Sequence, residues 1–186
     1  MTRYDYRGLA ELEPEIGFLP NMKTHQKITG LLLCTLLSAS GYAADTLKHS
    51  DHSFIEKAAK SGMEEVAISQ VAVARSTNPQ IKEFAQMMVS DHGGANSELT
   101  SLASTKGVTL PMDKTDIEKW TKRSTKDFDQ EYIDKMVSDH KDAVSLFEKE
   151  SKSTTGDPDL KAFALKTLPT LQAHLDKAKA LKEITK

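Results

Sequence analysis

Four side chains that can ionise or bind metals occupy positions where the surrounding pattern calls for apolar residues. They are Glu65, His92, His140 and His174, one near the middle of each of four successive helical segments. If these segments pack as one bundle, the four side chains meet at one level of its core. Burying an imidazole or a carboxylate there is costly unless it is hydrogen-bonded, ion-paired or bound to a metal. Three imidazoles and one carboxylate suit a single zinc, copper or iron ion, so the pattern predicts a transition-metal site.

Two other interpretations of these residues stay open at the level of sequence. A metal-free polar network can fix the alignment of helices at some cost in stability. Alternatively, the four side chains have unrelated surroundings. A distance criterion separates these cases, because ring nitrogens more than about 6 Å apart cannot share one metal with bonds near 2.1 Å.

Two aspartates and two methionines accompany the histidines. Asp91 and Asp139 each immediately precede one of them and therefore point about 100° away around the helix. We expect both aspartates to orient the second ring nitrogen of a neighbouring histidine, with pairing to lysines as the alternative. Met88 and Met136 lie one turn earlier on the histidine face. We expect them in the core, where their thioethers would favour copper(I) if a metal binds.

The elements that must position these residues are amphipathic helices. Apolar residues recur at alternating three- and four-residue steps, which predicts helices over about 53–76, 78–107, 124–152 and 157–181. In the second segment the inward stripe is Ile81, Ala85, Met88, His92, Ala95, Leu99 and Leu102. Glu65 instead lies at the border of its apolar face, beside small residues. Each histidine therefore takes a core position.

Start and stop signals define the predicted helix ends. Ser53 and Glu56 form a capping box, Asn78 and Asp157 each precede a proline, and Gly107 is a typical C-terminal stop. His49 and His52 precede the first predicted helix and should be solvated. The long connection over 108–123 predicts a crossover along the bundle. We therefore expect an all-α, ferritin-like four-helix bundle over 53–183, with a flexible segment at 44–52.

The N-terminal region has the pattern of an export signal. Residues 22–27 are basic, 28–40 are mostly apolar, and Gly41 to Ala43 supply small residues for cleavage, which predicts a signal peptide over 22–43. The apolar run is shorter than the about 20 residues of a membrane span, although an uncleaved anchor helix is the alternative. Residues 1–21 are expected to be a non-native or disordered extension. Cys34 lies in the signal, so the mature chain would lack cysteine.

Composition excludes several classes of function. The chain has 186 residues and a formal net charge of −2, without a basic stripe, which argues against a nucleic-acid partner. Charged residues make up 28% and aromatic residues 6%, which favours a helical bundle over a β-sandwich. The membrane is expected as a partner only during export. We find no nucleophile motif and no phosphate-binding loop, so an enzymatic activity is not predicted.

Several short stretches between Phe54 and Leu181 form a recognisable pattern: Gly62 to Val66, Phe84-Ala85, Met88 to His92, Gly107 to Pro111, Phe128-Asp129 with Tyr132, Met136 to His140, and Leu168 to Leu175. Through these stretches the region resembles the exported bacterial family known as domain of unknown function 4142, a ferritin-like helical bundle. The resemblance implies a periplasmic or secreted protein and no established reaction. Di-iron members of the ferritin-like fold carry Glu-x-x-His motifs, whereas Val89, Val137 and Leu171 occupy the glutamate positions here. A di-iron centre is therefore not expected.

Three functional hypotheses follow. The first is an exported metal-binding bundle with His92, His140 and His174 as ligands and Glu65 as a ligand or gate. The second is a non-enzymatic envelope or stress-related structural protein with a metal-free polar centre. The third is a metalloenzyme acting on reactive oxygen species, which requires an open coordination position.

Overall fold

The computed structural model describes residues 47–110 and 117–185 of the chain, and these are all-helical apart from turns and short connections. The expected extension at 1–21 and the expected signal peptide at 22–43 lie outside the described residues. The helices are α1 (His49–Arg75), α2 (Pro79–Thr105), α3 (Glu118–Thr121), α4 (Thr125–Ser151) and α5 (Pro158–Ile184). None of the helices in the described ranges is both long and apolar enough to cross a membrane.

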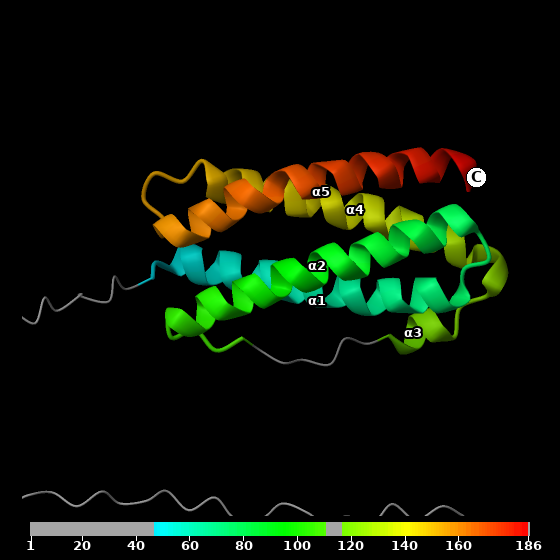
Figure 1. Ribbon diagram of the computed structural model, residues 1–186, viewed down its shortest axis with the longest axis horizontal. Coiled ribbons are helices and arrows are strands. Elements are labelled where there is room, and N and C mark those ends of the chain that lie inside the picture. Colours follow the sequence, from blue (N-terminus) through cyan, green and yellow to red (C-terminus); the bar gives the residue numbers. More distant parts are fainter. Residues whose placement is uncertain (1–46, 111–116, 186) are drawn as a thin grey trace, which may run out of the picture. The chain divides into compact units, whose positions relative to one another are not determined.

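The four long helices form a bundle with a crossover between its two hairpins. Helix α1 packs against α2 and α4, and α5 packs against α4 and α2. Figure 1 shows that α2 and α4 run in the same direction, whereas each is antiparallel to α1 and α5. The connection from α2 to α4 must therefore return along the length of the bundle. This arrangement is that of a ferritin-like bundle, as the sequence predicts.

Most helix ends lie where the sequence signals place them. The Asn78 side chain accepts a hydrogen bond from the backbone of Gln80 at 2.9 Å. The Asp157 carboxylate accepts from the backbone N–H groups of residues 159 and 160 at 3.0 and 3.1 Å. Each of these caps is followed by proline at the first helical position. After α2, Gly107 adopts a φ of 71°, a left-handed conformation that favours glycine and stops the helix.

The start of α1 differs from the prediction. The helix begins at His49 and not at Ser53, so residues 49–52 are helical and not part of a flexible segment. The physical reason is Asp51, whose buried carboxylate accepts the backbone N–H of Lys48 at 3.0 Å and satisfies an early donor of the helix. His49 and His52 are exposed, as expected.

The hydrophobic core is divided into two parts by a polar layer. One part contains Ile68, Phe84, Met88, Phe128, Tyr132 and Met136 among its buried residues. The other contains Phe54, Leu99, Phe147, Phe163 and Leu171 among its buried residues. On every long helix, the residue singled out from the sequence lies between these two parts. Met88 and Met136 are fully buried, as predicted.

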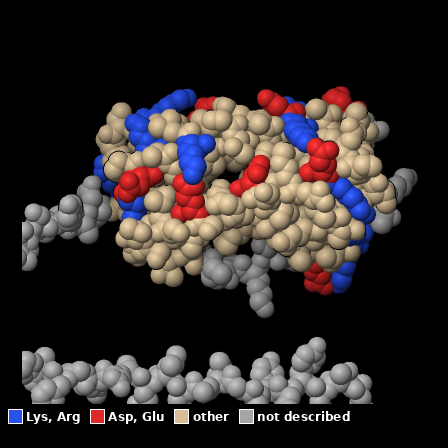
Figure 2. Space-filling view, viewed as in Figure 1, with Lys and Arg blue, Asp and Glu red and all other residues tan. Residues whose placement is uncertain are grey.

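Ion pairs connect α5 to α2 at the surface. Lys166 and Lys177 of α5 reach Glu98 and Glu83 of α2, with N···O distances of 2.7 and 3.2 Å. Figure 2 shows acidic and basic side chains intermixed over this face of the bundle. Such exposed pairs contribute little stability individually, about 0–1 kcal/mol each.

Candidate metal centre

The structure brings the four predicted side chains together from four helices. Glu65 comes from α1, His92 from α2, His140 from α4 and His174 from α5. Their exposed fractions are 1%, 7%, 0% and 2%, respectively, so the cluster is withdrawn from solvent.

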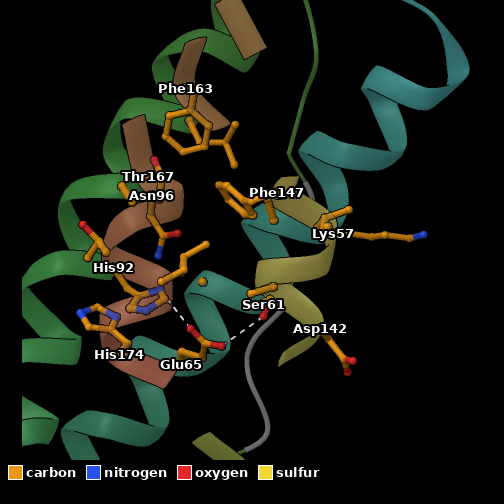
Figure 3. A pocket seen from close by; sticks show the side chains of 18 of the residues that line it. Lys57, Ser61, Glu65, His92, Asn96, Asp142, Phe147, Phe163, Thr167 and His174 are labelled. Atoms are coloured by element: carbon orange, nitrogen blue, oxygen red, sulfur yellow. Dashed lines mark hydrogen bonds and ion pairs between the residues drawn. The ribbon is translucent and has the colours of Figure 1, made fainter. Parts of the chain in front are cut away.

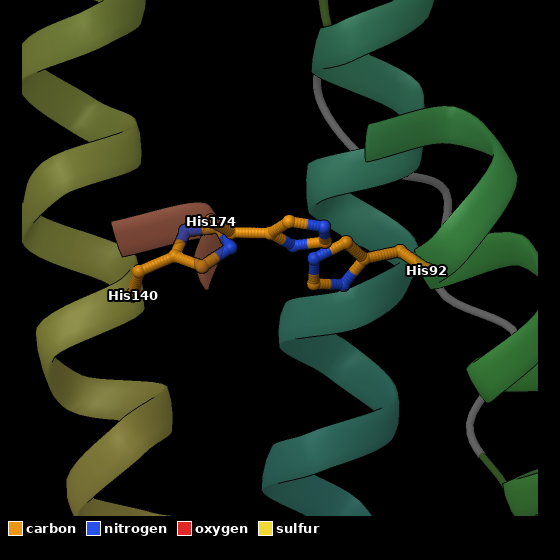
Figure 4. A group of neighbouring side chains, drawn as sticks. All are labelled: His92, His140 and His174. Carbon is orange, nitrogen blue, oxygen red and sulfur yellow. The ribbon is translucent and has the colours of Figure 1, made fainter. Parts of the chain in front are cut away.

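The three imidazole rings extend toward one another from three helices, as Figure 4 shows. The ring centroid of His92 lies 5.4 Å from that of His140 and 5.3 Å from that of His174. The centroids of His140 and His174 are 5.4 Å apart. One ring nitrogen from each histidine lies within 4.8 Å of the other two. This nitrogen spread is below the separation of about 6 Å at which sharing is excluded. Two bonds of about 2.1 Å span at most about 4.2 Å, so the rings need only close by a fraction of an ångström to share one ion.

Each histidine hydrogen-bonds through one ring nitrogen to an oxygen that acts as the acceptor. The pairs are His92 Nδ1 with Glu65 Oε2 at 3.0 Å, His140 Nδ1 with the carbonyl oxygen of Met136 at 2.9 Å, and His174 Nε2 with Asp91 Oδ2 at 3.0 Å. A backbone carbonyl or an ionised carboxylate can only accept, so the ring nitrogen facing it must carry the proton.

The remaining ring nitrogens are buried and have no hydrogen-bond partner within the described part of the chain. They are His92 Nε2, His140 Nε2 and His174 Nδ1. In a neutral imidazole whose other nitrogen carries the proton, this nitrogen presents a lone pair. Each histidine can therefore offer one lone pair, and one ring nitrogen of each lies within 4.8 Å of the other two, an arrangement that suits a metal ion.

The electrostatics of the cluster favour an ionised Glu65 and neutral rings at His140 and His174. Burial alone would raise the pKa of Glu65, but the hydrogen bond from His92 and the charges of His92 and His140 outweigh it and hold that pKa below its ordinary value. Burial lowers the pKa of His140 to about 4 and also lowers the pKa of His174. At neutral pH, His140 and His174 therefore keep their lone pairs.

Glu65 takes a different place from the ligand position expected for it. One carboxylate oxygen accepts from His92, and the other lies 3.4 Å from the Ser61 hydroxyl. Because Glu65 is at the border of the apolar face of α1, its carboxylate reaches Nδ1 of His92. In this arrangement it lies behind the His92 ring.

The two aspartates have different partners. Asp91 contacts Nε2 of His174 at 3.0 Å. Asp139 does not take the predicted role, because it pairs with Lys135 at 2.8 Å, which also contacts Glu64 at 3.1 Å. This lysine pairing is the alternative that the sequence left open.

The third outer partner, the Met136 carbonyl oxygen, was missed by sequence reasoning. It belongs to the backbone, and the residue type at this position does not indicate it. Only helical spacing could have predicted it, since any helical histidine can reach the carbonyl four residues earlier.

Fold and site together define an all-α bundle with a buried three-histidine centre. The chain belongs to the family described as "Domain of unknown function (DUF4142)", whose model matches residues 37–181. No curated protein matches the chain.

Solved structures share this fold at low sequence identity. A DUF305 fragment from Deinococcus radiodurans has a TM-score of 0.64 and 9% identity, covering 74% of this chain and 97% of its own. CopM in its Cu(I)-bound form has a TM-score of 0.62 and 19% identity, covering 72% of this chain and 95% of its own. CopM in an Ag-bound form has a TM-score of 0.60 and 18% identity, with coverages of 72% and 94%.

Proposed function

We propose that this protein binds one transition-metal ion, in the first place copper(I), through His92, His140 and His174. The observation that carries the proposal is the convergence of three buried nitrogen lone pairs, each fixed by an acceptor on the opposite side of its ring. A metal-free network that only sets helix register would be expected to pair these nitrogens with donors. Three unpaired acceptors instead call for a cation.

Ligand type favours copper(I) over divalent ions. The Glu65 and Asp91 carboxylates behind two of the rings could balance either a monovalent or a divalent ion, so the choice rests on the soft ligands nearby. Met88 and Met136, both buried one turn from a histidine, add polarizable sulfur to the surroundings. The fold likeness to CopM, solved in Cu(I)-, Cu(II)- and Ag-bound forms, is consistent with this choice. Zinc and iron(II) also bind imidazole and are the comparison metals.

We also propose that the mature protein acts in the periplasm or outside the cell. Support comes from the signal-like pattern of residues 22–43. N-terminal sequencing of the protein from a periplasmic fraction should begin at Ala44. A protein found only in the cytosol with Met22 intact would contradict export.

The metal proposal is tested by competition titration of the untagged protein with a chromogenic Cu(I) chelator. We expect one ion per chain, and each of His92→Ala, His140→Ala and His174→Ala should lower the affinity by more than about 100-fold. The matched control is His52→Ala, an exposed histidine of α1, which should leave the affinity unchanged. Binding that is absent, or equally strong in His140→Ala, would refute the proposal.

A further inference from the structure

A cavity of about 450 Å³ opens beside the histidine cluster. Glu65, His92 and His174 line one end of it, and Phe147 and Phe163 line the other. Figure 3 shows both phenylalanines facing the space, while Lys57 and Asp142 point away from it. The volume falls within the range of about 300–1,000 Å³ that is typical of small-molecule sites.

Part of the cavity wall is apolar and belongs to the packed core. Leu99, Phe147, Phe163 and Leu171 line it and belong to the buried core. The two phenylalanine rings have centroids 5.8 Å apart and an interplanar angle of 50°, so they present a tilted aromatic wall. Such a wall stabilises a bound ring or branched hydrocarbon by removing its surface from water.

The cavity reaches two of the three histidines. His92 and His174 line it, whereas His140 lies behind them and does not. His92 Nε2 and His174 Nδ1 are unpartnered, and both residues are more than nine-tenths buried. An ion held by all three rings therefore has protein on the His140 side and open space on the other. A fourth coordination position would face the cavity.

The polar groups at this end disfavour an anion. The Glu65 carboxylate is buried at the floor, and Asp91 lies against the back of His174. These two carboxylates balance or exceed the charge of one bound ion. Lys57, Lys149 and Asp142 also line the cavity, so its lining as a whole holds no excess of positive charge that would attract an anion. The side chain of Asn96 offers a neutral amide at the wall; a Cβ at Gly62 would lie 2.1 Å from its Oδ1, so only glycine leaves it room.

We propose that this cavity binds a small uncharged molecule, with a ring-sized apolar body and a nitrogen or sulfur donor atom that completes the coordination of the metal. The inference rests on the proposed metal binding. It places the donor at the histidine end and the apolar body against Phe147 and Phe163. Asn96 provides a hydrogen bond to a polar group on the body.

The test uses 4-phenylimidazole as the probe and calorimetric titration under anaerobic conditions. Metal stoichiometry is measured first, so a failure to bind metal is recognised separately as a failure of the proposed function. We expect the Cu(I)-loaded protein to bind the probe at least about tenfold more tightly than imidazole, because the phenyl ring is buried. Benzoate, with the same ring and an anionic head, should bind at least about tenfold more weakly than the probe.

Three results would overturn the inference while leaving metal binding intact. Equal affinities for the probe and imidazole would show that the apolar walls are not used. Equal probe binding by metal-free protein would show that the metal is not involved. Benzoate binding as tightly as the probe would show that the site does not select uncharged donors.

Filling the cavity provides the matched variant. Ala95 lines the cavity on α2, and Ser97 is exposed on the same helix outside it. Ala95→Phe should lower the affinity for the probe by at least about tenfold and leave the metal stoichiometry unchanged. Ser97→Phe should change neither quantity. Thr170→Trp, at an exposed position of the lining, serves if thermal melts show Ala95→Phe to be unfolded. Undiminished probe binding in a folded filled variant would also refute the inference.

Discussion

At the scale of single residues, the decisive feature is what lies behind each histidine. A carboxylate, a backbone carbonyl and a second carboxylate each accept a hydrogen bond from one ring N–H. These acceptors determine which nitrogen presents its lone pair, and they restrict the rotation of the rings. In the proposed metal centre, the ligand set would therefore be prepared by groups that do not touch the metal.

Glu65→Gln tests this support directly. The amide keeps the shape of the side chain but removes the charge facing His92 Nδ1. The His92 ring should therefore become less basic and less firmly oriented. We expect metal affinity to fall by about 10- to 100-fold, as for comparable outer partners. Chelator competition measures the change.

The neighbouring Glu64→Gln is the control, because Glu64 pairs with Lys135 and not with a histidine. It should bind metal like the unmodified protein. If Glu65→Gln also binds metal normally, the carboxylate does not support the centre.

The sequence indicated the ligands better than their partners. The histidines were found because helical periodicity alone assigns a residue to the inward face. The positions of Glu65 and Asp139 depend on small rotations of a helix and on competing partners such as Lys135, which periodicity does not resolve. Met136 contributes through its backbone, where the residue type carries no information.

At the scale of elements, the long helices bring their central residues to the same height. Their equal length, 27 residues each, leaves every cluster residue near mid-helix. The two hairpins are joined at their interface by a buried hydrogen bond of 2.9 Å between the hydroxyls of Ser69 and Tyr132. This bond links α1 to α4 about one turn from Glu65.

Tyr132→Phe should destabilise the fold by about 1–3 kcal/mol, because it leaves the Ser69 hydroxyl buried without its partner. Urea denaturation measures the free energy of unfolding. The double variant Tyr132→Phe with Ser69→Ala should recover part of the loss, since no unpaired hydroxyl then remains. If the double variant loses as much free energy of unfolding as the two single variants added together, the two hydroxyls do not stabilise each other.

Helices and crossover were predictable because their signals are local or simple. Asn78 with Pro79 and Asp157 with Pro158 determine helix starts through their own backbone chemistry, and a long connection predicts a return along the bundle. The predicted start of α1 was wrong because the capping group, Asp51, lies in a segment without clear apolar periodicity. Packing that buries Asp51 is a tertiary effect.

At the scale of the whole molecule, a polar layer divides the core, and the buried imidazoles make stability depend on pH. Burial holds the pKa of His140 at about 4 in the folded protein, compared with 6.5 ordinarily, and lowers that of His174. Between about pH 4 and 6.5, the unfolded chain therefore binds more protons than the folded one. The free energy of unfolding must therefore decrease as the pH falls from 6.5 towards 4.

For the metal-free protein we expect a loss of about 1 kcal/mol per pH unit from His140 over this range, and a further loss in the same direction from His174. Chemical denaturation at a series of pH values measures it. His140→Leu should reduce the slope, because one of the titrating groups is removed. A stability that is constant, or that rises as the pH falls from 6.5 to 4, would contradict the buried neutral state of these rings.

The coordination shell itself is most directly observed by X-ray absorption at the copper edge of the Cu(I)-loaded protein. The account predicts three imidazole nitrogens at about 2.0 Å, with the outer-shell scattering of the rings, and the loss of one of them in His140→Ala. A first shell dominated by sulfur, or one without imidazole scattering, would contradict it.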